Sequence, residues 1–190
     1  QTGFNTKGTT YPSTNAVMST INTRAIVSNI FFMLNNFITL PLKPCLREFR
    51  PESVNLIGSG AFAGSNIKSM IIPNGVTTIG DHMFDDCTNL ENITLNDCIT
   101  SIGDYAFKRC SFTNINIPDS VTSIGDNAFE NCWRLKTIEL SNSTTYIGNS
   151  AFAHSSIEHC NIPSSVVTIG DSTFAGSCLT EITIPNNVTS

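Results

Sequence analysis

Histidine and cysteine side chains give this chain its best means of binding a metal or of nucleophilic catalysis, and three of them cluster in the sequence. His154, His159 and Cys160 lie within a span of seven residues. Imidazole and thiolate groups bind zinc, and a cysteine activated by a neighbouring histidine is a common nucleophile. Whether these three groups converge depends on the elements that carry them.

A strict internal repeat determines those elements. The pair Ile-Gly occurs six times, at steps of 22 or 23 residues, and a phenylalanine follows each isoleucine by five positions. A period of this length is typical of a solenoid, in which each repeat forms one coil and buries its apolar face against the next. We expect the six rings to stack as one column in the core, each contributing about 1.5–3 kcal/mol on burial. They are Phe62, Phe84, Phe107, Phe129, Phe152 and Phe174.

Each repeat predicts a short strand on one wall of the solenoid. Apolar and polar residues alternate there with a period of two, which indicates a strand with one buried face. Proline ends the strand in four repeats, for example Pro73 and Pro118, because it donates no ladder hydrogen bond. Stacking of the coils should join these strands into one parallel sheet. The strands begin at Ile67, Leu90, Phe112, Leu135, Ile157 and Leu179.

The rest of each repeat predicts a second short strand and a turn. Apolar runs such as 76–79 and 121–124 should line the opposite wall. The glycine of the Ile-Gly pair then allows a sharp turn. The aspartate that follows it in four repeats should cap a single helical turn that carries the phenylalanine. These aspartates are Asp81, Asp104, Asp126 and Asp171.

In this frame the histidine–cysteine cluster separates. His154 falls in the turn, His159 points out of its strand and Cys160 points in, because neighbouring residues of a strand face opposite sides. We therefore expect neither a metal site nor a nucleophilic pair. The sequence contains no phosphate-binding loop, dinucleotide fingerprint or metalloprotease motif, and it predicts no cofactor and no enzymatic activity.

Cysteine or serine fills the position three residues after each phenylalanine. Cysteine stands there in three repeats, at Cys87, Cys110 and Cys132, and serine in the others. A position that accepts these two small side chains indicates a buried slot. We interpret the cysteines as packed free thiols, and the alternative is a disulfide between neighbouring coils, whose columns come close to bridging distance.

The outward side chains of the first wall form the candidate binding surface. Most are short hydroxyl and amide groups, which both donate and accept hydrogen bonds. Such an array suits a polysaccharide or a protein loop, and the alternative is a solvated face that only keeps the sheet soluble. We call this surface the polar ladder. It comprises Ser69, Asn92, Thr94, Asn114, Asn116, Thr137, Glu139, His159, Asn161, Glu181 and Thr183.

Bulk composition argues against two classes of partner. The net charge is −5 and only 13% of residues are charged, so no basic stripe is available to bind nucleic acid or an anionic membrane. The apolar segment 25–40 has 16 residues, whereas a membrane-spanning helix needs about 20. We expect no nucleic-acid partner and no membrane insertion.

The chain divides into three parts. Residues 1–15 are polar and indicate a linker. Residues 16–50 begin with a helical pattern and predict an N-terminal helical cap over the open end of the first coil. Residues 51–190 form a solenoid of about six coils, which we expect to continue beyond the last residue.

The repeat resembles the BspA-like leucine-rich repeat family. The resemblance rests on the runs IPDSVTSIGDNAFENC at 117–132 and IPNGVTTIGD at 72–81, and it covers about residues 51–190. It implies a β-rich α/β leucine-rich-repeat solenoid in a surface-exposed protein that serves adhesion and host-cell recognition, with no catalytic residues to transfer. Met83 and Thr173 depart from the family pattern, in which alanine precedes the phenylalanine.

Residues 8–17, GTTYPSTNAV, are similar to a segment of phage tail-fibre proteins. That resemblance implies a receptor-binding tip on a virion surface, where such segments often precede a trimer-forming helix. It therefore predicts a homotrimer, and a strict monomer in solution with the N-terminal segment present would count against it.

Together these features predict a non-enzymatic recognition module. It should bind a host-cell surface glycan or protein through the polar ladder, outside the cell, on a cell surface or on a virion. The alternative is a structural spacer or oligomerising segment of a fibre, with binding elsewhere.

Overall fold

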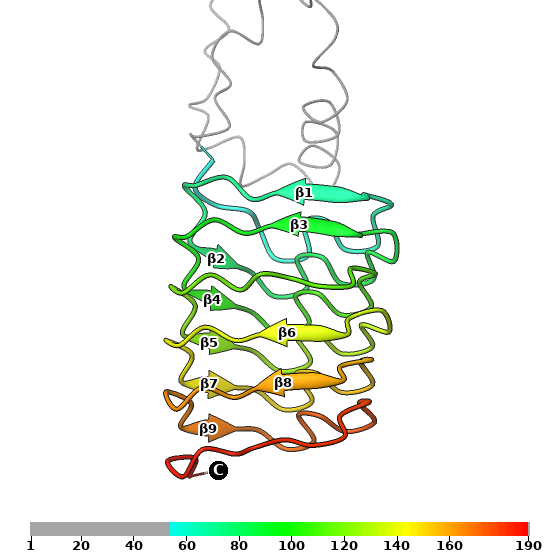
Figure 1. Cartoon of the computed structure of the whole chain (residues 1–190). Coiled ribbons are helices and arrows are strands. Elements are labelled where there is room, and N and C mark those ends of the chain that lie inside the picture. Colours follow the sequence, from blue (N-terminus) through cyan, green and yellow to red (C-terminus); the bar gives the residue numbers. More distant parts are fainter. Residues whose placement is uncertain (1–53, 190) are drawn as a thin grey trace, which may run out of the picture.

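The computed structural model describes residues 54–189, which form a solenoid with two β walls (Figure 1). Each coil runs along one wall, crosses to the other and returns through a corner. The strands of the first wall are β1 (Ser69–Ile71), β3 (Asn92–Thr94), β6 (Thr137–Glu139) and β8 (His159–Asn161). Those of the second wall are β2 (Thr78–Ile79), β4 (Ser101–Ile102), β5 (Ser123–Ile124), β7 (Tyr146–Ile147) and β9 (Thr168–Ile169).

The second wall is one continuous parallel sheet. Its five strands pair in the order β2-β4-β5-β7-β9. Isoleucines of like position lie opposite each other, as Ile79 does with Ile102, and both are buried. The predicted second wall and the predicted stacking of like positions are therefore confirmed.

The first wall is paired as strands in two places rather than along its whole length. β1 pairs with β3 and β6 pairs with β8, while the coil between β3 and β6 makes one bridge, from Asn116 to Glu139. That coil still runs along the same wall (Figure 1). It carries Phe112, which packs edge-on against Phe107 and Phe129 at ring-centroid distances of 5.8 and 6.2 Å. Because each strand has only three residues, a small displacement of one coil is enough to interrupt the pairing.

The six phenylalanines form the predicted column. Neighbouring ring centroids lie 5.2–5.4 Å apart and neighbouring planes are tilted by at most 24°. This is the offset stacking that aromatic rings prefer. Five of the rings are completely enclosed, whereas Phe174 in the last coil is half-buried. The column forms the centre of the core, and the two walls pack around it.

The turn between the Ile-Gly pair and the phenylalanine differs from the prediction. It is a series of β-turns rather than a helical turn, and it continues past the phenylalanine, with left-handed φ values of 54° at His82 and, beyond Phe84, 60° at Asp86. Asp81 does not cap its own turn, because the two backbone amides that could donate to its side chain already donate to carbonyl groups. Met83 donates to Gly80, and Phe84 donates to the carbonyl of Ala106 in the next coil.

The aspartates instead join one coil to the next. Asp81 Oδ1 accepts a hydrogen bond of 3.0 Å from the amide of Asp104, and Asp104 Oδ1 accepts one of 2.8 Å from the amide of Asp126. Asp126 and Asn149 continue the series with bonds of 2.7 Å each. Each carboxylate thus satisfies a backbone donor that would otherwise face solvent at the edge of the stack.

The glycine of the Ile-Gly pair also has a different role from the one predicted. Its φ is not in the left-handed region. A methyl group at Gly125 would lie 2.8 Å from the amide nitrogen of Asp104 in the preceding coil. Glycine is therefore needed because neighbouring coils approach each other closely. At Gly80 the nearest atom would be Ser59 Oγ at 3.5 Å, since the preceding coil carries serine in place of aspartate.

The predicted cysteine slot is buried. The Sγ atoms of Cys87, Cys110 and Cys132 each donate to the phenylalanine carbonyl of the preceding coil, at 3.0, 3.3 and 3.1 Å. All three are free thiols. Burial raises the pKa of Cys87, raises that of Cys110 well above its usual range and raises that of Cys132 to about 12. These thiols serve as small packed donors.

Four predictions fall outside the described residues. They are the linker at 1–15, the helical cap at 16–50, the tail-fibre similarity at 8–17 and the apolar segment 25–40. Between residues 54 and 189, no helix is long and apolar enough to cross a membrane.

We predict that Phe129→Ala lowers the free energy of unfolding by about 3–5 kcal/mol, because it removes a fully buried ring between Phe107 and Phe152. Phe174→Ala is the matched control and should cost less, since Phe174 stacks on Phe152 alone among the described rings. Chemical denaturation measures both. A loss below about 1 kcal/mol for Phe129→Ala would show that this ring does not lie in the core.

We predict that Gly125→Ala destabilises the protein by about 1–3 kcal/mol, because the new methyl group forces two coils apart. Gly80→Ala makes the same chemical change where the contact distance is ordinary, and it should be neutral or slightly stabilising. Thermal unfolding compares the two variants. Equal melting temperatures would show that the close approach does not constrain the stack.

Thiol reactivity tests the buried slot. A thiol reagent at pH 8 should modify the exposed Cys98 and Cys178 in the native protein and spare Cys110 and Cys132 until it unfolds. Unfolded thiols ionise near pH 9.0, whereas native Cys132 stays protonated to about pH 12, so stability should fall as the pH rises through that window. Mass spectrometry after pulse labelling locates the modified residues. Rapid native labelling of Cys132 would contradict its burial.

Candidate functional site

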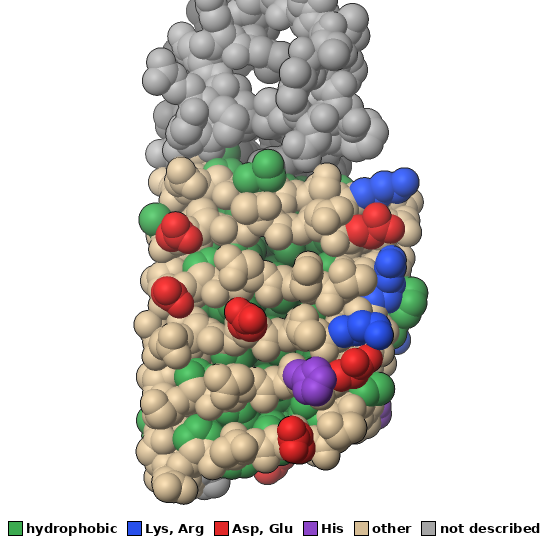
Figure 2. Space-filling view, in the orientation of Figure 1, with side chains coloured by type: hydrophobic (Ala, Val, Ile, Leu, Met, Phe, Trp, Pro, Cys, Tyr) green, Lys and Arg blue, Asp and Glu red, His purple; other side chains and the backbone are tan. Residues whose placement is uncertain are grey.

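The polar ladder lies on the outer side of the first wall. Strand register places Ser69 beside Asn92, Thr137 beside His159 and Glu139 beside Asn161. All eleven of its side chains are exposed. Between them Met70, Ile115 and Ile138 are buried and Ile93 and Cys160 are half-buried, whereas Ile182 in the last coil is exposed. The predicted alternation of this wall is therefore confirmed except in the last coil. Figure 2 shows the face as mainly neutral and polar, with a few acidic groups and a histidine.

The side chains of the polar ladder have no partners inside the described part of the protein. None of the eleven donates or accepts a hydrogen bond or forms an ion pair among residues 54–189. Their donors and acceptors therefore face solvent and are free for a ligand. Side-chain partners are also absent, within these residues, for four outward residues of the second wall, Thr78, Ser101, Ser123 and Thr168. The polar ladder differs in that its eleven side chains are all exposed, whereas only Thr78 among those four is.

Several polar side chains elsewhere are bound to neighbouring coils. On the second wall Thr100, Thr122 and Thr145 each donate a hydrogen bond of 3.1–3.2 Å to a carbonyl of the preceding coil. At the turn edge the aspartates accept backbone amides, as described above. Those groups hold the coils together, and their hydrogen-bonding capacity is partly used.

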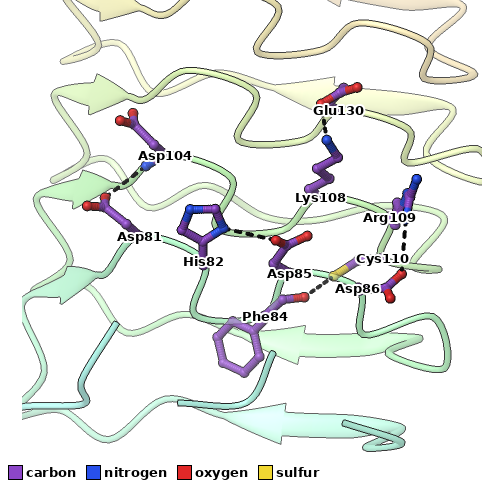
Figure 3. A network of polar contacts seen from close by, with 10 residues as sticks. All are labelled: Asp81, His82, Phe84, Asp85, Asp86, Asp104, Lys108, Arg109, Cys110 and Glu130. Atoms are coloured by element: carbon purple, nitrogen blue, oxygen red, sulfur yellow. Dashed lines mark hydrogen bonds and ion pairs between the residues drawn. The ribbon is translucent and has the colours of Figure 1, made fainter. Parts of the chain in front are cut away.

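The turn edge also carries a network of paired charges that sequence reasoning missed (Figure 3). The ring of His82 stacks on Tyr105 at 4.7 Å, and its Nδ1 lies 2.9 Å from Asp85 Oδ2. Lys108 Nζ lies 2.7 Å from Glu130 Oε2. Aligning the repeats could have found the second pair, because its residues are one period of 22 apart. The Lys108–Glu130 pair and the His82–Tyr105 stack join neighbouring coils, whereas His82 and Asp85 belong to one coil. Because these groups are partnered with each other, they indicate stabilisation of the stack rather than a ligand site.

Charges also border the polar ladder. The ladder contains Glu139, Glu181 and His159 but no lysine or arginine. Beside its strands, Lys136 Nζ lies 3.0 Å from Glu158 and Arg134 lies 3.7 Å from Glu91. These pairs are exposed and contribute little to stability. Lys136 and Arg134 are therefore paired, whereas Lys68, which directly precedes Ser69, forms no ion pair among residues 54–189. The face itself carries two glutamates and no lysine or arginine.

The histidine–cysteine cluster does not converge. His154 lies in a turn with a φ of 56°, His159 is exposed on the outer side of β8 and Cys160 is half-buried on the inner side. Burial raises the pKa of the Cys160 thiol to about 12, so it is a poor nucleophile at neutral pH. Within residues 54–189 no three His, Cys, Asp or Glu side chains are arranged to hold a metal ion.

Comparison with solved structures finds leucine-rich repeat proteins. One from Bacteroides ovatus is 30% identical, with a TM-score of 0.63, and the match covers 70% of this chain and 41% of that one. One from T. pallidum is 33% identical, with a TM-score of 0.65, and the match covers 68% and 63%. The pneumococcal vaccine antigen PcpA is 27% identical, with a TM-score of 0.57, and the match covers 63% and 31%.

The chain spans less than two thirds of each of these three proteins. No curated protein sequence matches it. The family model for the BspA-type leucine-rich repeat region matches in six copies, over residues 19–132 and 100–190. With the repeat, the stacked phenylalanines and the parallel walls in agreement, the chain belongs to the BspA-type leucine-rich repeat family.

Proposed function

We propose that this chain is a non-enzymatic recognition module, exposed outside the cell, that binds a host-cell surface glycan or protein through the polar ladder. The observation that carries the proposal is the difference between surfaces. The polar ladder presents eleven exposed side chains that have no partners among residues 54–189, whereas the aspartates of the turn edge and Thr100, Thr122 and Thr145 of the second wall are bonded to neighbouring coils. The four outward serine and threonine residues of the second-wall strands are unpaired too within these residues, but only Thr78 among them is exposed.

The solenoid presents these groups in a fixed array. Neighbouring parallel strands lie about 4.8 Å apart, so each rung repeats its side chains at that spacing. The backbone beneath is held by inter-coil hydrogen bonds, and little conformational entropy is lost when a ligand binds to groups that are already placed. An extended ligand with hydrogen-bonding groups at similar intervals fits such an array best.

Family membership supports a surface location and an interaction role. A pneumococcal vaccine antigen is among the solved structures that this chain resembles. A cell surface is the location that we propose. The virion-surface and homotrimer alternatives rest on residues 8–17 alone, which lie outside the described residues.

We predict that replacing Asn114, Asn116, Thr137 and Glu139 together by alanine weakens binding to host cells by about tenfold or more. Four hydrogen-bonding side chains contribute about 0.5–1.5 kcal/mol each, and 1.4 kcal/mol corresponds to a factor of ten. All four are exposed, so the fold should be retained. Flow cytometry with labelled protein measures binding, and circular dichroism checks folding.

The matched control replaces Thr78, Ser101, Ser123 and Thr168 by alanine. These are outward residues of the second wall with similar side chains. The control variant should bind as the unaltered protein does. If the ladder variant also binds unchanged while folded, the polar ladder is not the binding surface. If the unaltered protein does not bind host cells, the chain acts as a spacer.

A further inference from the structure

Among the phenylalanine, tyrosine and tryptophan residues that the structure describes, Trp133 has the most exposed side chain. Trp133 is the single tryptophan of the 190-residue chain, and 61% of its surface is exposed. It occupies the corner that leads into β6, between the buried Cys132 and Leu135. The corner from Phe129 to Leu135 has one residue more than the corner from Phe107 to Phe112. The additional residue makes room for Trp133 and Arg134 without disturbing the core.

The backbone of Trp133 is held in place although its ring is exposed. Its amide donates to Asn131 at 2.9 Å, and its carbonyl accepts a hydrogen bond of 2.6 Å from Ser156 Oγ in the next coil. The guanidinium of Arg134 lies 5.7 Å from the ring centre. The backbone that carries the ring is therefore fixed, and the guanidinium of Arg134 is the cation over the ring.

Trp133 belongs to the corner that leads directly into the ladder strand β6. Trp133 precedes Thr137 by four residues, so the two are at most about 14 Å apart. Arg134 reaches Glu91, which directly precedes the ladder residue Asn92. A ligand of two or three sugar rings that touches the ladder near β6 is therefore long enough to reach the tryptophan.

The chemistry of the combined surface favours a carbohydrate over a protein. Protein interfaces concentrate their binding energy in clusters of apolar and aromatic anchors. The polar ladder consists of amides, hydroxyls and three ionisable groups, and its matching partner is a molecule rich in hydroxyl groups. The C–H face of a sugar ring carries partial positive charge and stacks on the negative face of an indole. Since the ladder has two glutamates and no lysine or arginine, a neutral sugar suits it better than an anionic one.

We propose that Trp133 is the stacking platform of a subsite for a neutral glycan, with the polar ladder binding the sugar hydroxyls beside it. This inference rests on the proposed function and names its ligand class. It gives the long corner before β6 a role in ligand binding, which is separate from any role in the stability of the fold.

Intrinsic fluorescence tests the subsite directly, because every photon of tryptophan emission comes from Trp133. An array of neutral and sialylated oligosaccharides of three or more rings identifies binders, which are then titrated in solution. We expect a saturable change in emission with a neutral glycan. Trp133→Ala should weaken that binding by about 30-fold or more, and Trp133→Phe should retain part of it.

Tyr146→Ala is the matched control, since Tyr146 is an exposed aromatic residue on the second wall and should not affect binding. If the four-residue ladder variant loses host-cell binding while Trp133→Ala keeps it and no glycan alters the emission, the subsite is wrong and the proposed function stands. If neither variant affects binding, both proposals fail. Undiminished binding to host cells stripped of glycans would show a protein partner and overturn the subsite alone.

Discussion

Vertical register between coils is the constraint on which this structure depends. Each coil completes the hydrogen bonds of its neighbour, through the parallel walls and through side chains such as Asp104. Where proline is missing at the end of a strand, Asn96 takes its place and donates to the carbonyls of Pro73 and Val76 at 2.7 and 3.0 Å. Among the described residues, no buried side-chain nitrogen or oxygen lacks a partner. A shift of one residue in any coil would break several of these bonds at once.

This constraint divides the surface between two tasks. Polar side chains of the turn edge and of part of the second wall hold the coils in register. The residue types at those positions are therefore constrained by folding. The first wall is held by its backbone and by buried residues such as Met70 and Ile138, which leaves its outward side chains free to vary. A surface that folding does not specify is the one on which binding specificity can be built.

The sequence predicted the features that follow from periodicity. The phenylalanine column, the two walls, the buried cysteine slot and the outward position of the polar ladder each came from like residues at like intervals. Contacts between coils were harder to predict, because a single repeat does not show what lies above it. Asp81 was therefore expected to cap its own turn, and Gly125 was expected to serve a bend instead of a close approach.

The roles of residues that occur in one repeat only could not be predicted for a related reason. Phe112 fits the apolar pattern of its strand, and only the packed core shows that its ring lies edge-on between two others where the pairing of the wall is interrupted. In the sequence, Trp133 belongs to a corner that is one residue longer than others. Only the structure shows that its side chain is exposed while Cys132 and Leu135 are buried.

The corners tolerate a difference of one residue, whereas the walls do not, and this gives the protein two separate ways to diversify. Gain or loss of a whole coil would lengthen or shorten the ladder by about 4.8 Å and so alter its avidity for a polymer in discrete steps. Insertion at a corner would place a new side chain at the margin and leave the register intact, as the long corner before β6 does. Reach and selectivity can therefore evolve independently on the same scaffold.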